Sequence, residues 1–488
     1  MKNWKLAVAA IAFTVGVGVG IAITSRSGTE ALEAGSTFAA QAVPGVREAA
    51  AAETTTSQAL PFSTSSPRYT PVVEAARRVA PSVVSITVVK TMGQSAQRDL
   101  FSEFFNRRSR AAPRVFGSGF TIDVDGYILT NDHVVADADS IVVADASGHR
   151  FPAELVGGDA LVDIAVLKIA PGRIPPAPLG TSSDLVVGEP AIAIGNPLAT
   201  LVANAEATVT SGVISGVGRD MRESPSEGTL YADMIQTDAS INPGNSGGAL
   251  VNAEGEVIGV NSSILSRSGG SEGLGFAIPI DRALRIASEL KQFGRIRRPW
   301  IGVDPEVVSS DSSSFSRTRV RRVAEGSPAS RAGLQPGDVL LSIQGRPIDS
   351  PLDFEVGLLD AGVGANVDVV YVRADGQHEA RLPVVELPSE QAERVEVLTG
   401  LQLITVDDRI SVERGLPVDF GALIADISDE AAYRSGLRKG DVIVAINQKR
   451  IETVDEAQSL FRSFAGGSRI LATVVRDGHL VNTFFGIR

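Results

Sequence analysis

Residues 244–264, GNSGGALVNAEGEVIGVNSSI, begin with GNSGG, one serine among three glycines, and continue with a run of alternating apolar residues. Glycine, asparagine and serine are common in surface turns, so the GNSGG portion is compatible with an ordinary turn. The same glycines allow backbone N–H groups to converge beside a hydroxyl, as an oxyanion hole requires. The alternation from Ala249 onward predicts a β-hairpin. The stretch therefore predicts a β-rich fold that presents Ser246 at a glycine-rich turn.

A serine nucleophile needs a base, and the chain contains only 4 histidines. Three of them, His149, His378 and His479, follow glycine turns between strand-like segments, where we expect solvated side chains. His133 instead lies in ILTNDHVVADAD, directly after an apolar strand. A lone histidine there would more often be structural, but a serine partner elsewhere makes His133 the candidate base.

The carboxylate that would orient this histidine is best sought next to a buried strand. Asp163 stands at the head of the apolar segment DIAVLKI. A carboxylate in that position needs a hydrogen-bond or charge partner, and an imidazole N–H supplies one. The alternative is a turn residue at a strand edge. Asp132 is adjacent to His133, but consecutive strand residues point to opposite faces, so we do not expect it to orient the ring.

The order His133, Asp163, Ser246 is that of chymotrypsin and not of subtilisin. Residues 244–248 also match the G-x-S-x-G pattern of α/β-hydrolases, which requires strand, turn and helix, with Asp and His following the serine. A hairpin pattern follows Ser246 here, and the later histidines lie in turns. The sequence therefore argues against the α/β-hydrolase arrangement.

The composition narrows the class of protein. A length of 488 residues suggests about three domains. The formal net charge is −12 and no basic cluster stands out, which argues against nucleic acid as a partner. The chain has no cysteine, so disulfides, thiolate catalysis and cysteine-based zinc sites are excluded. We expect no cofactor and no metal.

The N-terminal 24 residues have the pattern of an export signal. Two lysines precede a charge-free apolar run at residues 6–24, and this order is typical of secretory signals. The run is also long enough to span a bilayer, so both cleavage and retention as an inner-membrane anchor are open. In either case the remainder lies outside the cytoplasm. Residues 25–70 are rich in Ala, Ser, Thr, Gly and Pro and predict a flexible tether.

Two further regions follow the tether. Residues 71–293 contain many short β-branched segments, which predict an antiparallel barrel or sandwich, with helical patterns only at the two ends. The remainder contains an internal repeat with an offset of about 100 residues. In it, SRAGLQPGDVLLSIQGRPI from Ser330 matches YRSGLRKGDVIVAINQKRI from Tyr433. The repeat predicts two tandem modules.

Several motifs together resemble the HtrA/Deg serine proteases of bacterial envelopes. They are GSGFTIDVDGYILTNDHVV, DIAVLKI, AIGNP, QTDASINPGNSGGAL and GLGFAIPI, and they occur in the family's order. The two repeats resemble PDZ domains, at residues 297–388 and 395–488. The resemblance implies a mainly β fold: a chymotrypsin-like double β-barrel protease domain followed by two PDZ domains.

The resemblance also implies roles for individual residues. Ser246 would be the nucleophile, His133 the general base and Asp163 the residue that orients it. Backbone N–H groups of Gly244, Asn245 and Ser246 would form the oxyanion hole. Ile241 and Leu274 would line a small apolar specificity pocket, which implies cleavage after Val, Ala or similar residues.

Regulatory and peptide-binding positions follow from the same resemblance. Arg219 would lead a sensor loop at residues 219–228, and the aromatic segment at 99–105 resembles one that precedes the first barrel. A peptide C-terminus would be held by the loop of the first PDZ domain, formed by Trp300, Ile301, Gly302 and Val303. The corresponding loop of the second, residues 398–401, matches the motif less closely. Asp132 stands where the family more often has a neutral residue, and its charge should shift the pH optimum modestly.

The function implied is that of an ATP-independent serine endopeptidase. It would degrade misfolded or unfolded envelope proteins in the periplasm, as a homotrimer or larger assembly, and PDZ binding of peptides with free apolar C-termini would regulate it. Two alternatives remain open at this point. One is a chaperone or PDZ scaffold with little proteolysis. The other is a regulatory, membrane-anchored protease of one signalling substrate.

Overall fold

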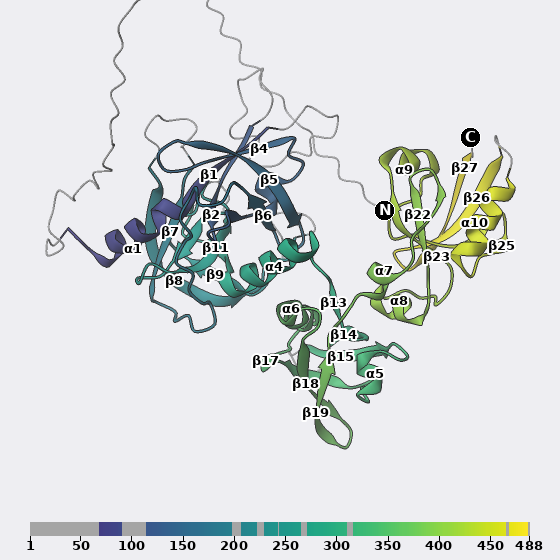
Figure 1. Cartoon of the computed structure of the whole chain (residues 1–488). Coiled ribbons are helices and arrows are strands. Elements are labelled where there is room, and N and C mark those ends of the chain that lie inside the picture. The colour runs from purple at the N-terminus through teal and green to yellow at the C-terminus, as the bar shows by residue number, and fades with distance from the viewer. Residues whose placement is uncertain are drawn as a thin grey trace, which may run out of the picture. The chain divides into compact units, whose positions relative to one another are not determined.

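The computed structural model describes residues 68–89, 114–197, 206–221, 229–242, 244–264, 271–309, 316–464 and 468–486 (Figure 1). The predicted signal segment, nearly all of the tether, the aromatic segment at 99–105 and most of the sensor loop lie outside these residues. Within the described ranges, no helix combines the length and apolar character needed to cross a bilayer.

The first barrel is closed and antiparallel. Its strands are β1 (Val83–Val89), β2 (Arg114–Thr121), β3 (Tyr127–Thr130), β4 (Ser140–Ala144), β5 (Arg150–Asp159) and β6 (Ile164–Lys168). Around the barrel they lie in the order β1-β2-β3-β6-β5-β4. Alternating apolar side chains fill the interior, among them Ile86, Ile128 and Leu167, each fully buried.

A second closed barrel has the order β10-β11-β12-β9-β8-β7. Its strands are β7 (Pro190–Gly195), β8 (Thr208–Arg219), β9 (Met234–Thr237), β10 (Ala249–Val251), β11 (Val257–Ile264) and β12 (Gly275–Pro279). β10 and β11 form the hairpin that the sequence predicts after Ser246. The expectation of a barrel or a sandwich is thus resolved in favour of two barrels.

Helices accompany the barrels at the places that the sequence indicates. α1 (Pro71–Val79) begins at Thr70, whose hydroxyl accepts a hydrogen bond from the Val73 N–H. α4 (Ile280–Phe293) follows the second barrel, lies against β6 and β11, and ends at Gly294, which has a φ of 69°. Among the described residues of the two barrels, the other helical elements are η1 (Ala80–Ser82) and α3 (Asp132–Val135).

Two modules follow, and they share a common core of strands and helices. The first contains β13 (Pro299–Trp300), β14 (Val303–Ser309), β15 (Ser316–Val323), α5 (Pro328–Arg331), β16 (Val339–Ile343), β17 (Arg346–Pro347), α6 (Pro351–Ala361), β18 (Asn366–Arg373), β19 (Gly376–Pro383), β20 (Val385–Glu386) and α7 (Pro388–Gln391). The second contains β21 (Val395–Leu398), β22 (Leu401–Thr405), α8 (Asp408–Glu413), β23 (Ala422–Ile427), α9 (Asp429–Ser435), β24 (Val442–Ile446), β25 (Lys449–Arg450), α10 (Val454–Ser463), β26 (Arg469–Arg476) and β27 (His479–Gly486). Their main sheets run β14-β15-β16-β18-β19 and β21-β22-β23-β24-β26-β27.

The same ion pair recurs in both modules. Arg373 donates from Nε to the buried Asp338 at 2.7 Å, and Arg476 donates in the same way to the buried Asp441 at 2.7 Å. Each arginine also reaches a backbone carbonyl, that of Gly333 or Gly436. These contacts, called here the Arg–Asp clasps, join the turn before the central strand to the end of a neighbouring strand. The internal repeat read from the sequence is therefore a structural repeat.

Candidate active site

Asp163 and His133 form the pair that the sequence predicts. Asp163 lies directly before β6 with a φ of 53°, in the left-handed region that aspartate tolerates better than most residues. Its side chain is nearly fully buried. Asp163 Oδ1 lies 2.8 Å from His133 Nδ1 and accepts the His133 backbone N–H at 3.1 Å. Two bonds to one residue fix both the position and the tautomer of the imidazole.

Ser262 is a further member of the site, and it links the two barrels. Its hydroxyl donates to Asp163 Oδ2 at 2.9 Å, and its carbonyl accepts the Ser246 hydroxyl at 3.1 Å. Asn131 Nδ2 donates to the Asp163 carbonyl at 2.9 Å. Neither residue was singled out from the sequence. Ser262 lies in the middle of the hairpin pattern, and no local motif distinguishes it from the neighbouring Ser263.

His133 belongs to the short helix α3 and not to a strand. The argument that adjacent strand residues face opposite ways therefore rests on the wrong local structure. Its conclusion still stands, because Asp163 bonds to the ring. The helix forms because Val134 and Val135 both turn into the core of the first barrel, where they are almost fully buried.

Ser246 lies at a glycine-rich turn before β10, as predicted. Gly244 and Gly247 have φ values of 99° and 81°, which side-chain-bearing residues rarely adopt. A Cβ on Gly247 would lie 2.2 Å from the Ser118 carbonyl oxygen of the first barrel. Ser118 in turn donates its backbone N–H to the Ser246 carbonyl at 2.9 Å. Because glycine has no side chain, the turn that carries Ser246 can pack directly against the first barrel.

One predicted oxyanion donor has a different partner. The Asn245 N–H donates to the Asn242 carbonyl at 2.9 Å and closes a turn. A backbone N–H makes one strong hydrogen bond at a time, so in this structure Asn245 is not a donor to an oxyanion. The N–H groups of Gly244 and Ser246 remain as the candidates on either side.

The two predicted specificity residues differ in exposure. Ile241 is only 1% exposed, and its side chain packs closely on Gly275, where a Cβ would lie 3.0 Å from it. Leu274 precedes β12 and is 38% exposed. Ile241 therefore lies inside the second barrel, while Leu274 lies at the surface beside it.

The remaining predicted positions are not members of the candidate triad of Ser246, His133 and Asp163. Arg219 ends β8, is exposed, and pairs through its backbone with Met234. Trp300 and Ile301 are buried, Gly302 has a φ of 100°, and Val303 begins the edge strand β14. His149 and His378 pair with turn aspartates, and His479 begins β27.

Asp132 lies in an acidic neighbourhood beside the triad. Burial, together with the charges of Asp163 and Asp159, raises its pKa to about 6, and the charge of His133 opposes this shift. Close packing explains the burial, because a Cβ on Gly158 would lie 2.2 Å from the Asp132 carboxylate. Asp132 is thus a second carboxyl group near His133, and it ionises near neutral pH.

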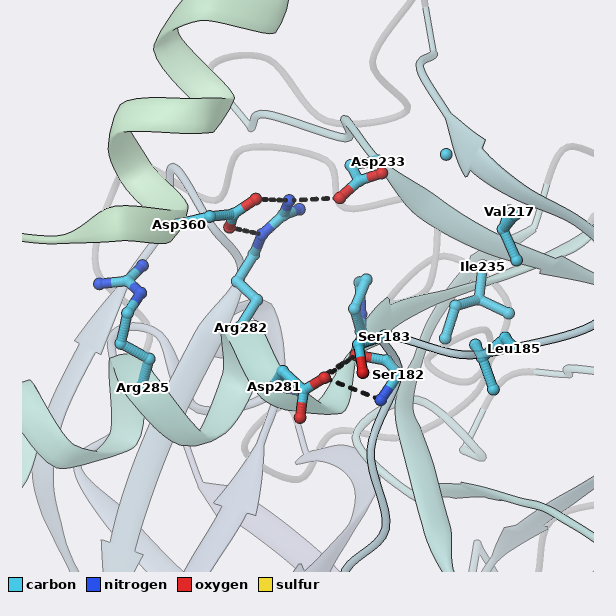
Figure 2. Close-up of a pocket in the computed structure, with 12 residues that line it drawn as sticks. Ser182, Ser183, Leu185, Val217, Asp233, Ile235, Asp281, Arg282, Arg285 and Asp360 are labelled. Carbon is cyan, nitrogen blue, oxygen red and sulfur yellow. Dashed lines mark hydrogen bonds and ion pairs between the residues drawn. The ribbon is translucent and has the colours of Figure 1, made fainter. Parts of the chain in front are cut away.

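A cavity of about 280 Å³ is lined by residues of α4, β8 and β9 and, on one side, by Asp360 of the first module (Figure 2). Arg282 crosses its wall and donates to Asp360 of α6 at 2.7 and 2.9 Å. The same guanidinium reaches Asp233, just before β9, at 3.1 Å. Arg346 of the first module also contacts Asp233, at 3.0 Å. The first module therefore contacts the protease domain at α4 and at Asp233, the residue that precedes β9.

Comparisons with known proteins agree with this arrangement. Residues 117–260 match the trypsin-like peptidase domain family, and residues 319–373 and 428–476 match the PDZ domain family. A protein of Hahella chejuensis described as a probable periplasmic serine endoprotease, DegP-like, is 37% identical, over 85% of this chain and 92% of its own. A Pseudomonas fulva protein of the same description is 36% identical, over 84% and 92%. The solved structure of the HtrA-type protease AlgW with a tripeptide is 34% identical, with a TM-score of 0.50, and the match covers 65% of this chain and 97% of that one.

Proposed function

The chain belongs to the HtrA-type family of DegP-like serine endoproteases, and on this premise we propose that it degrades unfolded or misfolded envelope proteins without ATP. Its relatives are described as periplasmic, which supports the same compartment for this chain. The observation that carries the proposal is the linkage at Ser262. One residue bonds both to the nucleophilic hydroxyl of Ser246 and to the carboxylate that holds His133.

The proposed reaction is acyl transfer through Ser246. Its Oγ attacks the carbonyl carbon of the scissile peptide bond while His133 Nε2 takes the hydroxyl proton. The protonated His133 then gives this proton to the amine nitrogen as the C–N bond breaks. A water molecule, deprotonated by His133, hydrolyses the acyl-enzyme and regenerates Ser246. Asp163, bonded to Nδ1, stabilises the imidazolium that forms in both halves of the reaction.

The tetrahedral intermediates carry a negative oxygen that the backbone must stabilise. The N–H groups of Gly244 and Ser246 are the proposed donors, and one such donor is typically worth about 3 kcal/mol of barrier. Ile241 is buried and packs on Gly275. We propose that it forms the base of a specificity pocket that takes Val, Ala or similar small side chains before the cleaved bond.

Regulation is proposed to run through the first PDZ domain. A peptide with a free apolar C-terminus would add to the edge strand β14 beside α6, with its carboxylate at the loop Trp300–Val303. The ion pairs from Asp360 to Arg282 and from Arg346 to Asp233 support a connection from this groove to Arg219 and the sensor loop. Assembly as a homotrimer or larger oligomer, and the choice between a cleaved signal and a retained anchor, stay proposals by analogy with the family.

The test is casein hydrolysis by the purified chain, with and without ATP, beside the Ser246→Ala variant. We expect hydrolysis that ATP does not change and that the variant lacks completely. Equal, near-zero turnover in both proteins, also after addition of a peptide with a free apolar C-terminus, would overturn the protease proposal in favour of a chaperone or scaffold. Residual casein hydrolysis by the Ser246→Ala variant would show that Ser246 is not the nucleophile.

A further inference from the structure

The two PDZ domains differ at the strand edge that receives a peptide. In each, a glycine of positive φ precedes this strand: Gly302 before β14 and Gly400 before β22, with φ values of 100° and 75°. Each glycine packs on a serine, Ser327 or Ser428, so closely that a Cβ would lie within 2.3 Å of the serine hydroxyl. The two loops are therefore built alike, and β22 occupies the place of β14.

The outer edge of β22 is already paired. Within the described residues, β14 pairs only with β15, whereas β22 pairs with β23 on one side and with β21 on the other. β21 runs antiparallel to β22, and the end of β21 nearest the loop is Leu398. A peptide bound by strand addition to a PDZ domain has this same direction, with its C-terminus at the loop.

The side chains of β21 lie where those of a bound peptide would lie. β21 contacts α10, the helix that flanks β22 as α6 flanks β14; β22 and α10 are labelled in Figure 1. Val397 is 9% exposed and belongs to one apolar cluster with Leu403 of β22 and with Ala457 and Phe461 of α10. The groove between strand and helix is thus filled by the chain itself.

A carboxylate is also present at the loop. Glu396 Oε1 accepts the Gly400 backbone N–H at 2.9 Å. Backbone N–H groups of this loop are the ones that hold the terminal carboxylate of a peptide ligand. In the first domain, the segment at the matching position has another partner, since Pro299–Trp300 pairs with Val385–Glu386 of β20.

We propose that Val395–Leu398 is a tethered ligand of the second PDZ domain, with the Glu396 carboxylate in the place of a peptide's terminal carboxylate. This inference rests on the proposed function only in taking PDZ domains as receptors for peptide C-termini. The occupant defines the ligand class: an extended peptide of alternating apolar and acidic residues with a free apolar C-terminus. A short tether gives an effective concentration in the millimolar range, so roughly micromolar external peptides compete poorly until β21 is released.

The test uses the full chain carrying Ser246→Ala, so that the probe is not cleaved. The probe is a fluorescein-labelled peptide ending in Arg-Val-Glu-Val-Leu with a free carboxylate, which copies residues 394–398. Its C-terminal amide is the control for carboxylate recognition. Because Glu396 and Gln402 are direct partners across β21 and β22, Glu396→Cys with Gln402→Cys places two thiols for a cross-strand disulfide. The chain has no other cysteine.

We expect the reduced double variant to bind one more probe molecule per chain than the oxidised one, by titration calorimetry. Both forms are the same polypeptide, so a folding defect would appear in both and is monitored by circular dichroism. Equal stoichiometry in the two redox states overturns the proposal. If the protease proposal fails instead, the chain that retains Ser246 leaves casein intact, while the redox difference in the Ser246→Ala chain persists.

A second pair of variants removes the need for cysteines. Glu396→Gln keeps the size of the side chain and loses its charge, and we expect the affinity of the second site for the probe to rise severalfold, since a charge-assisted hydrogen bond is weakened. Glu393→Gln, at an exposed position three residues upstream, is the matched control. Equal effects of the two substitutions would contradict the role of Glu396.

Discussion

The two PDZ domains share their framework and differ in what lies beside it. Both have a positive-φ glycine at the loop, a serine packed on it, and an Arg–Asp clasp behind the central strand. The edge of β14 pairs with no further strand among the described residues, while the edge of β22 carries β21. The comparison shows that a PDZ domain can have the peptide-binding loop and still have no groove open to an external peptide. The few residues before the loop decide whether the groove is open.

A second difference concerns the flanking helices. Asp360, in the last turn of α6, accepts hydrogen bonds from Arg282 of the protease domain, whereas Ser463 stands near the same point of α10. The hydroxyl of Ser463 donates to its own helix, at the Leu460 carbonyl. An open groove and a helix tied to the protease thus occur in the same domain, and this supports the proposal that regulation runs through the first PDZ domain.

The largest effect should come from closing the first loop. Gly302→Val places a Cβ within 2.1 Å of the Ser327 side chain and strains a φ of 100°. We expect at least a roughly tenfold loss of affinity for the apolar C-terminal peptide, measured by fluorescence anisotropy in the Ser246→Ala background; tenfold corresponds to about 1.4 kcal/mol.

The matched variant is Gly400→Val, whose Cβ would lie 2.3 Å from the Ser428 hydroxyl. It should leave the binding site of the first domain unchanged. Equal loss of binding in both variants would mean that the two grooves contribute alike, and the comparison would fail.

The next effect concerns what the two domains share. Asp338→Ala and Asp441→Ala each remove the buried carboxylate of one Arg–Asp clasp. The arginine then loses its charged partner, and a backbone N–H loses its acceptor. Each should lower the unfolding temperature of its own domain by roughly 5 °C. Differential scanning calorimetry measures both. A large loss in one variant and none in the other would show that the clasps are not equivalent.

A smaller effect should separate the flanking helices. Asp360→Asn weakens the two hydrogen bonds to Arg282. We expect the peptide-dependent change in kcat/KM for a casein-derived substrate to fall severalfold, because a coupling energy is typically about 1–3 kcal/mol. Ser463→Ala in the second domain is the control and should leave this response intact. If the peptide-dependent change in kcat/KM is the same in Asp360→Asn, the contact between Asp360 and Arg282 has only a structural role.

The smallest effect should come from Asp132, which lies beside the candidate triad, and it should not change either PDZ domain. The pKa of Asp132 is raised from 3.8 to about 6, so the unfolded state releases this proton at lower pH than the folded state does. Ionisation of Asp132 therefore lowers the free energy of unfolding. This loss of stability grows as the pH rises from 3.8 to about 6 and is complete above that range. Asp132→Asn should stabilise the protein above pH 6 by about 1 kcal/mol, allowing for its partial exposure.

Urea unfolding at about pH 4 and at about pH 7 tests this, since the gain should vanish at the lower pH. The acidic limb of the kcat/KM profile should also move slightly toward lower pH, because a negative charge near His133 is removed. Peptide binding by either PDZ domain should not change. If Asp132→Asn changes neither the pH profile of kcat/KM nor the free energy of unfolding, the charge of Asp132 does not affect the site.

Much of this molecule could be read from its sequence. The hairpin after Ser246 excluded the α/β-hydrolase arrangement, and an aspartate ahead of a buried strand indicated the partner of His133. Ser262 escaped notice because its role depends on contact between two barrels, which a local pattern does not encode. The family resemblance implies that Asn245 is an oxyanion donor, but a motif alone does not reveal the turn that its N–H closes. The pairing of β21 with β22 is not predictable from the sequence for a related reason. Val395–Leu398 is an ordinary alternation of apolar residues, and only its register with β22 shows that it covers the edge of that strand.

The Arg–Asp clasps have a consequence for the history of such chains. In each, the two partners stand 35 positions apart and lie within a single module. Recombination between equivalent points of the two copies would give a gene with one module or with three. Every resulting module would still contain a complete clasp, because an exchange replaces an aspartate or an arginine with its counterpart. Module number can therefore change in one genetic step without loss of a buried charge partner.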